Sequence, residues 1–78
     1  MEHKLKILPE YFIDIVDGRK TFEVRKNDRN FNVGDTLVLQ EWSNGTYLAG
    51  YARVQVTYIL NDSQYCKEGY VILGIKLI

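Results

Sequence analysis

Segments of alternating polar and apolar side chains recur through this 78-residue chain. A period of two is typical of β-strands that bury only one face. Alternation and strand-forming residues together predict strands over residues 3–8, 21–26, 36–42, 47–60 and 70–78. Because a short chain buries these faces most economically by curling one sheet, we expect a mainly β fold, a small barrel of five to six mostly antiparallel strands.

One short α-helix interrupts the strand pattern after the first segment. Pro9 suits the first helical position, where its missing N–H would have no partner. Phe12, Ile15 and Val16 then form an apolar stripe, and Gly18 is placed to end the helix in a left-handed conformation. We expect this helix to cover the open end of the barrel.

Within residues 21–26 the alternation predicts which side chains share a face. Phe22 and Val24 are expected to face the core, and Glu23 and Arg25 to share the opposite face.

Two glycine-containing sites predict changes in chain direction. Asn44-Gly45 is a strong hairpin-turn signal, and the long segment 47–60 is expected to bend at Gly50.

Length and composition indicate one small domain covering residues 1–78. No apolar run approaches the roughly 18 residues that would span a bilayer, and the first residues do not resemble a secretory signal. Cys66 is the only cysteine, so an intramolecular disulfide framework is excluded and a reducing cytoplasm is expected.

The charges are balanced in number but uneven in position. The chain has ten basic and ten acidic residues, yet residues 18–30 carry a net charge of +3. Basic clusters of this kind attract nucleic acid, although charges on a strand edge also serve to discourage edge-to-edge pairing. The cluster consists of Arg19, Lys20, Arg25, Lys26 and Arg29, against Glu23 and Asp28.

Lys20, Glu23 and Arg25 form the most informative constellation. Glu23 and Arg25 lie two apart on a predicted strand, so their side chains project side by side at roughly 6.5 to 7 Å. Two cations suit phosphate or carbonyl oxygens, and a carboxylate suits a donor such as the amine edge of cytosine or guanine. The alternative is a surface salt-bridge trio without a ligand.

The pattern Gly-x-Lys-x-x-Glu-x-Arg over residues 18–25 resembles the signature of the activating signal cointegrator homology (ASCH) family. The turn at residues 33–36 also resembles that family, and the likeness extends from His3 to the segment 70–75. The resemblance implies a barrel similar to that of pseudouridine synthase and archaeosine transglycosylase (PUA) domains. It also implies a cleft between the helix and the strand that carries the trio, and binding of RNA or a nucleotide-like ligand.

One branch of that family hydrolyses acetylated cytidine with a Lys, a Thr and a Glu. Lys20 occupies the position of the branch's Lys, but Glu23 stands where the Thr would be, and the later Glu has no clear equivalent. We therefore expect a binding module rather than an enzyme. An amidohydrolase acting on a modified nucleoside such as N4-acetylcytidine, and a protein-interaction module, are the alternatives.

Aromatic side chains supply a second nucleic-acid signal, because exposed rings stack on unpaired bases. Trp42, Tyr47 and Tyr58 are candidates, with Trp42 expected to be the most exposed; the alternative is that such rings fill the barrel ends. The predicted ligand contacts are Lys20, Glu23, Arg25, Lys26, Arg29, Trp42 and Tyr58.

The sequence predicts neither a metal site nor a cofactor. His3 is the only histidine and has no partner at ligand spacing, so we expect it on the surface. Cys66 has no visible histidine or acid to activate it, and no glycine-rich phosphate-binding loop occurs.

Overall fold

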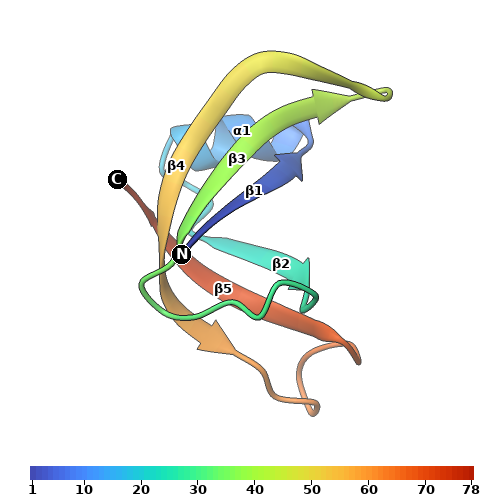
Figure 1. Ribbon diagram of the computed structural model, residues 1–78, viewed down its shortest axis with the longest axis vertical. Coiled ribbons are helices and arrows are strands. Elements are labelled where there is room, and N and C mark those ends of the chain that lie inside the picture. Colours follow the sequence, from blue (N-terminus) through green and yellow to red (C-terminus); the bar gives the residue numbers. More distant parts are fainter.

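The computed structural model describes residues 1–78 as five strands and one helix, which confirms the mainly β prediction (Figure 1). A single sheet has the order β1-β3-β4-β5-β2, with only the β1–β3 pair parallel. In chain order the elements are β1 (Glu2–Ile7), α1 (Pro9–Val16), β2 (Phe22–Lys26), β3 (Thr36–Ser43), β4 (Thr46–Leu60) and β5 (Tyr70–Leu77).

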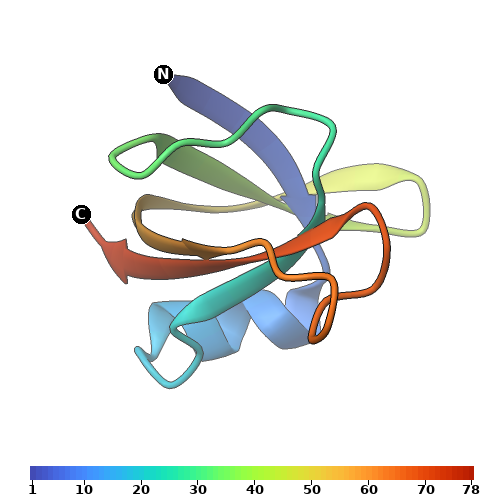
Figure 2. The ribbon, with the colours of Figure 1, turned by 90° about the horizontal axis from the view of Figure 1, so that it is seen from below.

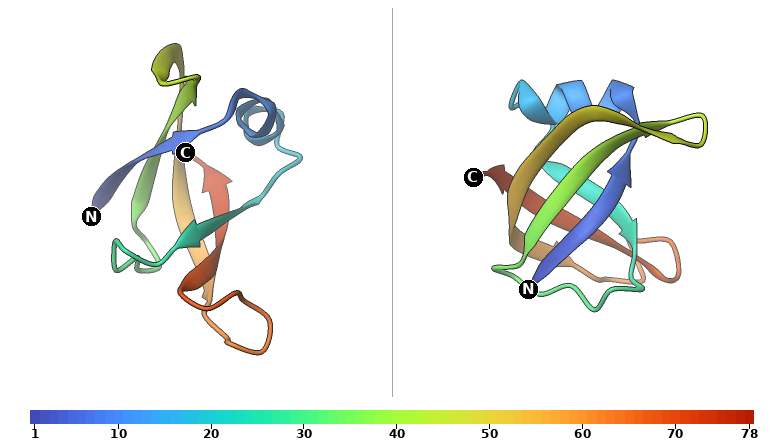
Figure 3. Two further views of the ribbon diagram at one scale, coloured as in Figure 1. Left: turned by 90° about the vertical axis from the view of Figure 1, so that its right-hand side faces the viewer. Right: turned by 45° about the horizontal axis from the view of Figure 1, so that its top comes forward.

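The sheet curls into a half-barrel because the long strand β4 pairs with both β3 and β5. Its first part, as far as Gln55, pairs with β3, and its last part, from Val54, pairs with β5. The strand curves strongly along its length (Figure 1). As a result β1, β3 and the start of β4 form a layer that crosses over β5 and β2 (Figure 3). The helix α1 lies along one side of this curled sheet (Figure 2).

Gly50 lies in a register irregularity of β4, at the position where the sequence predicted a bend. The regular pairing of β3 with β4 is interrupted between Gln40 and Trp42, and Gly50 falls in the unpaired part of β4. A Cβ atom at Gly50 would lie 2.8 Å from the ring of Phe12 and 2.7 Å from a carboxylate oxygen of Glu41. Glycine therefore allows α1 to pack directly on the sheet.

The core fills the space between the curled sheet and the helix. Ile15 of α1 is almost fully buried, and Phe12 packs against the core from the same helix. The remaining core side chains come from all strands except β2, and from the loop residue Phe31; they are Leu5, Ile7, Leu37, Leu39, Val54, Val56, Val71, Leu73 and Ile75.

Two arginines bridge the open seam of the half-barrel. The edge strands β1 and β2 share no ladder of main-chain hydrogen bonds. Instead, Nη2 of Arg25 donates to the carbonyl oxygen of Lys6 at 2.7 Å, and Nη1 of Arg29 donates to that of Lys4 at 3.1 Å. The seam is therefore closed by side chains that carry positive charge.

The predicted orientation of β2 is wrong. Phe22 and Val24 are 45% and 54% exposed, whereas Glu23 is buried and lies opposite the core residue Leu73 of β5. Alternation determines which residues share a face but not which face turns inward. The inward charge is tolerated here because Glu23 is ion-paired, as described below.

His3 is also buried, contrary to the surface position that we expected. Its Nε2 lies 2.8 Å from Oδ2 of Asp35, and its ring packs edge-on against Phe31. The contact with His3 is the main cause that lowers the pKa of Asp35, and the main-chain N–H of Asn32 acts in the same direction, while burial opposes both. The pair ties β1 to the turn that precedes β3.

The helix α1 has eight residues, and no helix of the structure is long and apolar enough to cross a membrane.

Candidate functional site

The end of α1 brings Lys20 to the mouth of a cleft. Gly18 adopts φ +79°, as predicted, and its N–H donates to Ile15 while that of Arg19 donates to Asp14, the pattern of a Schellman motif. This arrangement ends the helix and directs the chain back along its side. Lys20 therefore lies between α1 and the first residue of β2.

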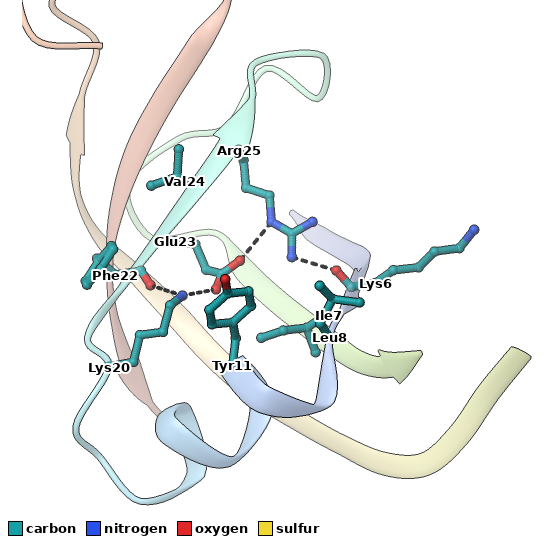
Figure 4. Close-up of a pocket in the computed structure, with 9 residues that line it drawn as sticks. All are labelled: Lys6, Ile7, Leu8, Tyr11, Lys20, Phe22, Glu23, Val24 and Arg25. Carbon is teal, nitrogen blue, oxygen red and sulfur yellow. Dashed lines mark hydrogen bonds and ion pairs between the residues drawn. The ribbon is translucent and has the colours of Figure 1, made fainter. Parts of the chain in front are cut away.

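The cleft lies between the end of β1, α1 and β2, and has a volume of about 410 Å³ (Figure 4). Small-molecule sites commonly occupy roughly 300 to 1,000 Å³ and combine an apolar lining with a few polar groups. Both kinds of side chain are present. The apolar lining is Ile7, Leu8, Tyr11, Phe22 and Val24, and the charged lining is Lys6, Lys20, Glu23 and Arg25.

Glu23 accepts from both neighbouring cations. Nζ of Lys20 lies 2.5 Å from one carboxylate oxygen, and Nε of Arg25 lies 2.8 Å from the other (Figure 4). The Glu23 side chain is 5% exposed, against 16% for Lys20 and 21% for Arg25. The trio thus combines two cations with one buried anion, and the more accessible members are the cations.

Aromatic rings surround the Lys20 ammonium. Its Nζ lies 4.9 Å from the ring centroid of Phe22 and 5.6 Å from that of Tyr11, within cation–π range. The same Nζ donates to the carbonyl oxygen of Phe22 at 2.8 Å. The ammonium is therefore fixed in position by several contacts before any ligand arrives.

The structure thus brings Lys20, Glu23 and Arg25 together, and places Lys26 and Arg29 in an adjoining hollow that shares Arg25 with the cleft. Arg19, from the same basic cluster, instead pairs with Asp14 and Asp17 at the helix end.

Trp42 and Tyr58 do not line the cleft or the adjoining hollow. Trp42 is half-buried rather than the most exposed ring, because the Lys6 side chain covers it with Nζ 4.9 Å from the ring centroid. Tyr58 is 66% exposed on the outer face of β4, next to a second register shift.

From the sequence we expected a cleft beside the helix but did not predict the contribution of β1 or of Tyr11. Lys4, Lys6 and Tyr11 line these hollows, although they are distant in sequence from the basic cluster. The alternation of β1 could have indicated that Lys4 and Lys6 share its outward face. Their proximity to Arg25 follows only from the curl of the sheet.

Comparison with known proteins identifies the family of this chain. Residues 2–75 match the family described as "Domain of unknown function (DUF3850)". The chain belongs to this family. As a DUF3850 domain it is 37% identical over 71 residues to the "Uncharacterized 12.9 kDa protein in GpA 3′ region" of Escherichia phage P2. That alignment covers 91% of this chain and 64% of the phage protein, so this chain spans less than two thirds of that relative.

The DUF3850 chain also resembles a solved structure, the crystal structure of hypothetical protein PH0355. The TM-score is 0.68, with 100% of each chain covered and 19% sequence identity. At this identity the likeness shows a shared fold alone.

Proposed function

We propose that this DUF3850 domain is a small RNA-binding or nucleotide-recognising module, and that the cleft between α1 and β2 receives a nucleotide. The observation that carries the proposal is the inward-facing trio of Lys20, Glu23 and Arg25 in an open, aromatic-lined cleft. Buried ion pairs contribute little net stability after desolvation. Because burial of this trio adds little net stability to the fold, its position in the cleft favours a role in ligand binding.

In this proposal the two cations contact ligand oxygens. An ammonium has three donors, of which Lys20 uses two, on Glu23 and on the carbonyl of Phe22. A guanidinium has five donors, of which Arg25 uses Nε on Glu23 and one N–H of Nη2 on Lys6. The remaining donors suit the phosphate or carbonyl oxygens of a nucleotide.

Glu23 then has a different role from the one expected from the sequence. Because both of its oxygens already accept from cations, we propose that it holds Lys20 and Arg25 in place. Contact with a base amine is a second use, open only to its remaining lone pairs. Tyr11 and Phe22 would provide the apolar surface against which a base lies.

The resemblance to the ASCH family supports the same assignment. The residues that carry the resemblance are the Schellman glycine, Gly18, and three of the four charged residues that line the cleft, Lys20, Glu23 and Arg25. We propose that DUF3850 domains and ASCH domains share this PUA-like cleft and its ligand class.

The test is nucleotide binding followed by NMR on the folded protein. Addition of CMP, UMP, GMP or AMP should shift the amide signals of residues 20–25 and of Tyr11. Lys20→Met should weaken binding by about 1 to 3 kcal/mol, since it removes a charge-assisted contact but keeps the apolar stem. Lys67→Met, on an exposed loop outside the cleft, is the matched control. Absence of binding, or shifts confined to another face, would contradict the proposal.

The amidohydrolase alternative predicts turnover, which the binding proposal does not. Incubation of the purified protein with N4-acetylcytidine distinguishes them through release of cytidine. Product formation that disappears in Lys20→Met would favour the enzyme; product that persists in the variant would indicate a contaminating activity. The protein-interaction alternative instead predicts a partner whose capture survives nuclease treatment.

A further inference from the structure

A second hollow continues the cleft along the seam of the half-barrel. This seam groove has a volume of about 300 Å³ and shares Lys6 and Arg25 with the cleft. It lies where β1 faces β2 and the loop that follows β2. Its charged lining is Lys4, Lys6, Arg25, Lys26, Arg29 and Asp28.

The seam groove concentrates positive charge, although the net charge of the whole chain is zero. It contains five of the ten basic residues and only one of the ten acidic residues. The groove therefore carries +4 by formal count, while the remaining residues carry −4. A groove lined by one sign of charge attracts ligands of the opposite sign far more than the net charge suggests.

The groove cations are not neutralised by neighbouring acids. Lys4, Lys6 and Lys26 form no ion pair. Arg29 donates to a main-chain carbonyl, which satisfies one donor without cancelling its charge. Arg25 is the exception, because its Nε pairs with Glu23. Four cations thus remain available to an anionic ligand with several charges.

One exposed aromatic residue beside the groove favours a nucleic acid over other polyanions. Tyr47 lines the groove and is 56% exposed, and Nζ of Lys6 lies 5.9 Å from its ring centroid. Proteins that hold single strands combine such a basic groove with rings on which bases stack. A lipid headgroup or an acidic peptide would use the charges but not the ring.

We propose that the seam groove binds the sugar–phosphate backbone that flanks the nucleotide in the cleft, so that the ligand is a single-stranded polynucleotide rather than a free nucleotide. This inference rests on the proposed function of the cleft. Arg25 and Lys6 belong to both hollows and join them. The strand would pass from the cleft across the seam, with Lys4, Lys26 and Arg29 contacting successive phosphates.

The test compares ligands of increasing length on the full chain at low salt. Titrations with UMP, a uridine tetranucleotide and the corresponding deoxythymidine tetranucleotide measure how affinity depends on flanking phosphates. We expect the tetranucleotide to bind at least about ten-fold more tightly than UMP. Tight binding of the RNA or the DNA tetranucleotide supports the inference, and their ratio identifies which polymer is preferred.

Variants test whether the tighter binding of the tetranucleotide depends on the groove. The double variant Lys4→Ala/Lys26→Ala should weaken tetranucleotide binding about ten-fold and leave UMP binding unchanged. The control, Lys67→Ala/Lys76→Ala, removes two exposed lysines that line neither hollow and should have no effect. Circular dichroism of each variant verifies that the fold is intact.

The outcomes separate this inference from the proposed function. If UMP binds but the tetranucleotide binds no more tightly, the inference is overturned and the nucleotide cleft stands. If neither UMP nor the tetranucleotide binds, both are overturned. The inference is also overturned if the groove variant loses UMP binding and tetranucleotide binding equally. It is overturned as well if the protein binds vesicles containing phosphatidylserine, or a polyglutamate peptide, as tightly as the tetranucleotide.

Discussion

At the scale of single residues, Glu23 organises the candidate site. It lies on the inward face of β2, opposite Leu73, and both of its oxygens are held by cations. A buried carboxylate without partners would cost several kcal/mol, so Lys20 and Arg25 are required for this position. The same two bonds fix the cations at the cleft. Binding and stability are therefore coupled through one side chain.

This coupling predicts that removal of Glu23 destabilises the fold. Glu23→Ala leaves two largely buried cations without an acid, and should lower the free energy of unfolding by about 3 kcal/mol. Urea denaturation at pH 7 measures the change. Glu68→Ala, an exposed acid without an ion pair, should stay within about 0.5 kcal/mol of the parent protein. A Glu23→Ala protein as stable as this control would show that the contacts of Glu23 with Lys20 and Arg25 do not stabilise the fold.

The lowered pKa of Asp35 predicts how the stability of the fold changes at acidic pH. Its pKa in the folded protein lies below the ordinary value of 3.8, first because of its bond to His3. The folded state therefore binds fewer protons than the unfolded state in this range. The resulting stabilisation is fully present above about pH 4 and is lost as the pH falls through the lowered pKa.

Asp35→Asn should consequently lower stability at pH 7, by about 1 to 3 kcal/mol, and flatten the loss of stability below pH 4. Urea denaturation from pH 7 to pH 2 checks both effects. Asp28→Asn, an exposed acid that forms no ion pair, should keep the slope of the parent protein. If Asp35→Asn retained the full acid response, the Asp35 contact would not be its source.

At the scale of elements, the packing of α1 on the sheet depends on one glycine. Gly50→Ala would place a Cβ atom 2.8 Å from the ring of Phe12, so the ring or the helix that carries it must shift. Overpacking of this kind costs about 1 to 3 kcal/mol. Thermal and urea unfolding of Gly50→Ala, Phe12→Leu and the double variant form a cycle. The double variant should lose less than the sum of the single losses; strict additivity would exclude the clash as the cause.

Much of the fold could be predicted from local sequence. The helix start at Pro9, the left-handed Gly18 and the Asn44-Gly45 turn, whose residues both have positive φ, were all indicated by residues that favour those conformations. The bend near Gly50 was indicated in the same way. These features are local, so neighbouring residues determine them.

The features that were mispredicted depend on distant contacts. The inward face of β2 depends on Lys20, on β5 and on the curl of the sheet, none of which alternation encodes. His3 is buried because Asp35, 32 positions later, supplies its partner. For the same reason the sequence predicted the trio and its two basic neighbours but not Lys4 and Lys6, which the seam brings beside them.

At the scale of the whole molecule, the curl of the sheet separates charge that is mixed along the chain. The sequence carries no net charge, yet the seam groove collects half of the basic residues. Attraction of a polyanion to such a groove depends on the release of its counterions, so salt weakens it. The steepness of that response reports how many cations contact phosphates.

Single-stranded nucleic acid should therefore bind with a log–log salt dependence of about −2 to −3.5, because each phosphate contact contributes about −0.7 and three to five cations are available. Fluorescence anisotropy of a labelled uridine octanucleotide between low and moderate salt measures this slope. Lys4→Ala/Lys26→Ala should make it shallower by about 1.4, one contact for each lysine. Lys67→Ala/Lys76→Ala, which removes the same charge outside the groove, should leave it unchanged. A slope near zero would mean that the groove does not contact phosphates. An equal change in both double variants would mean that the net charge of the protein, rather than the groove, governs the salt dependence.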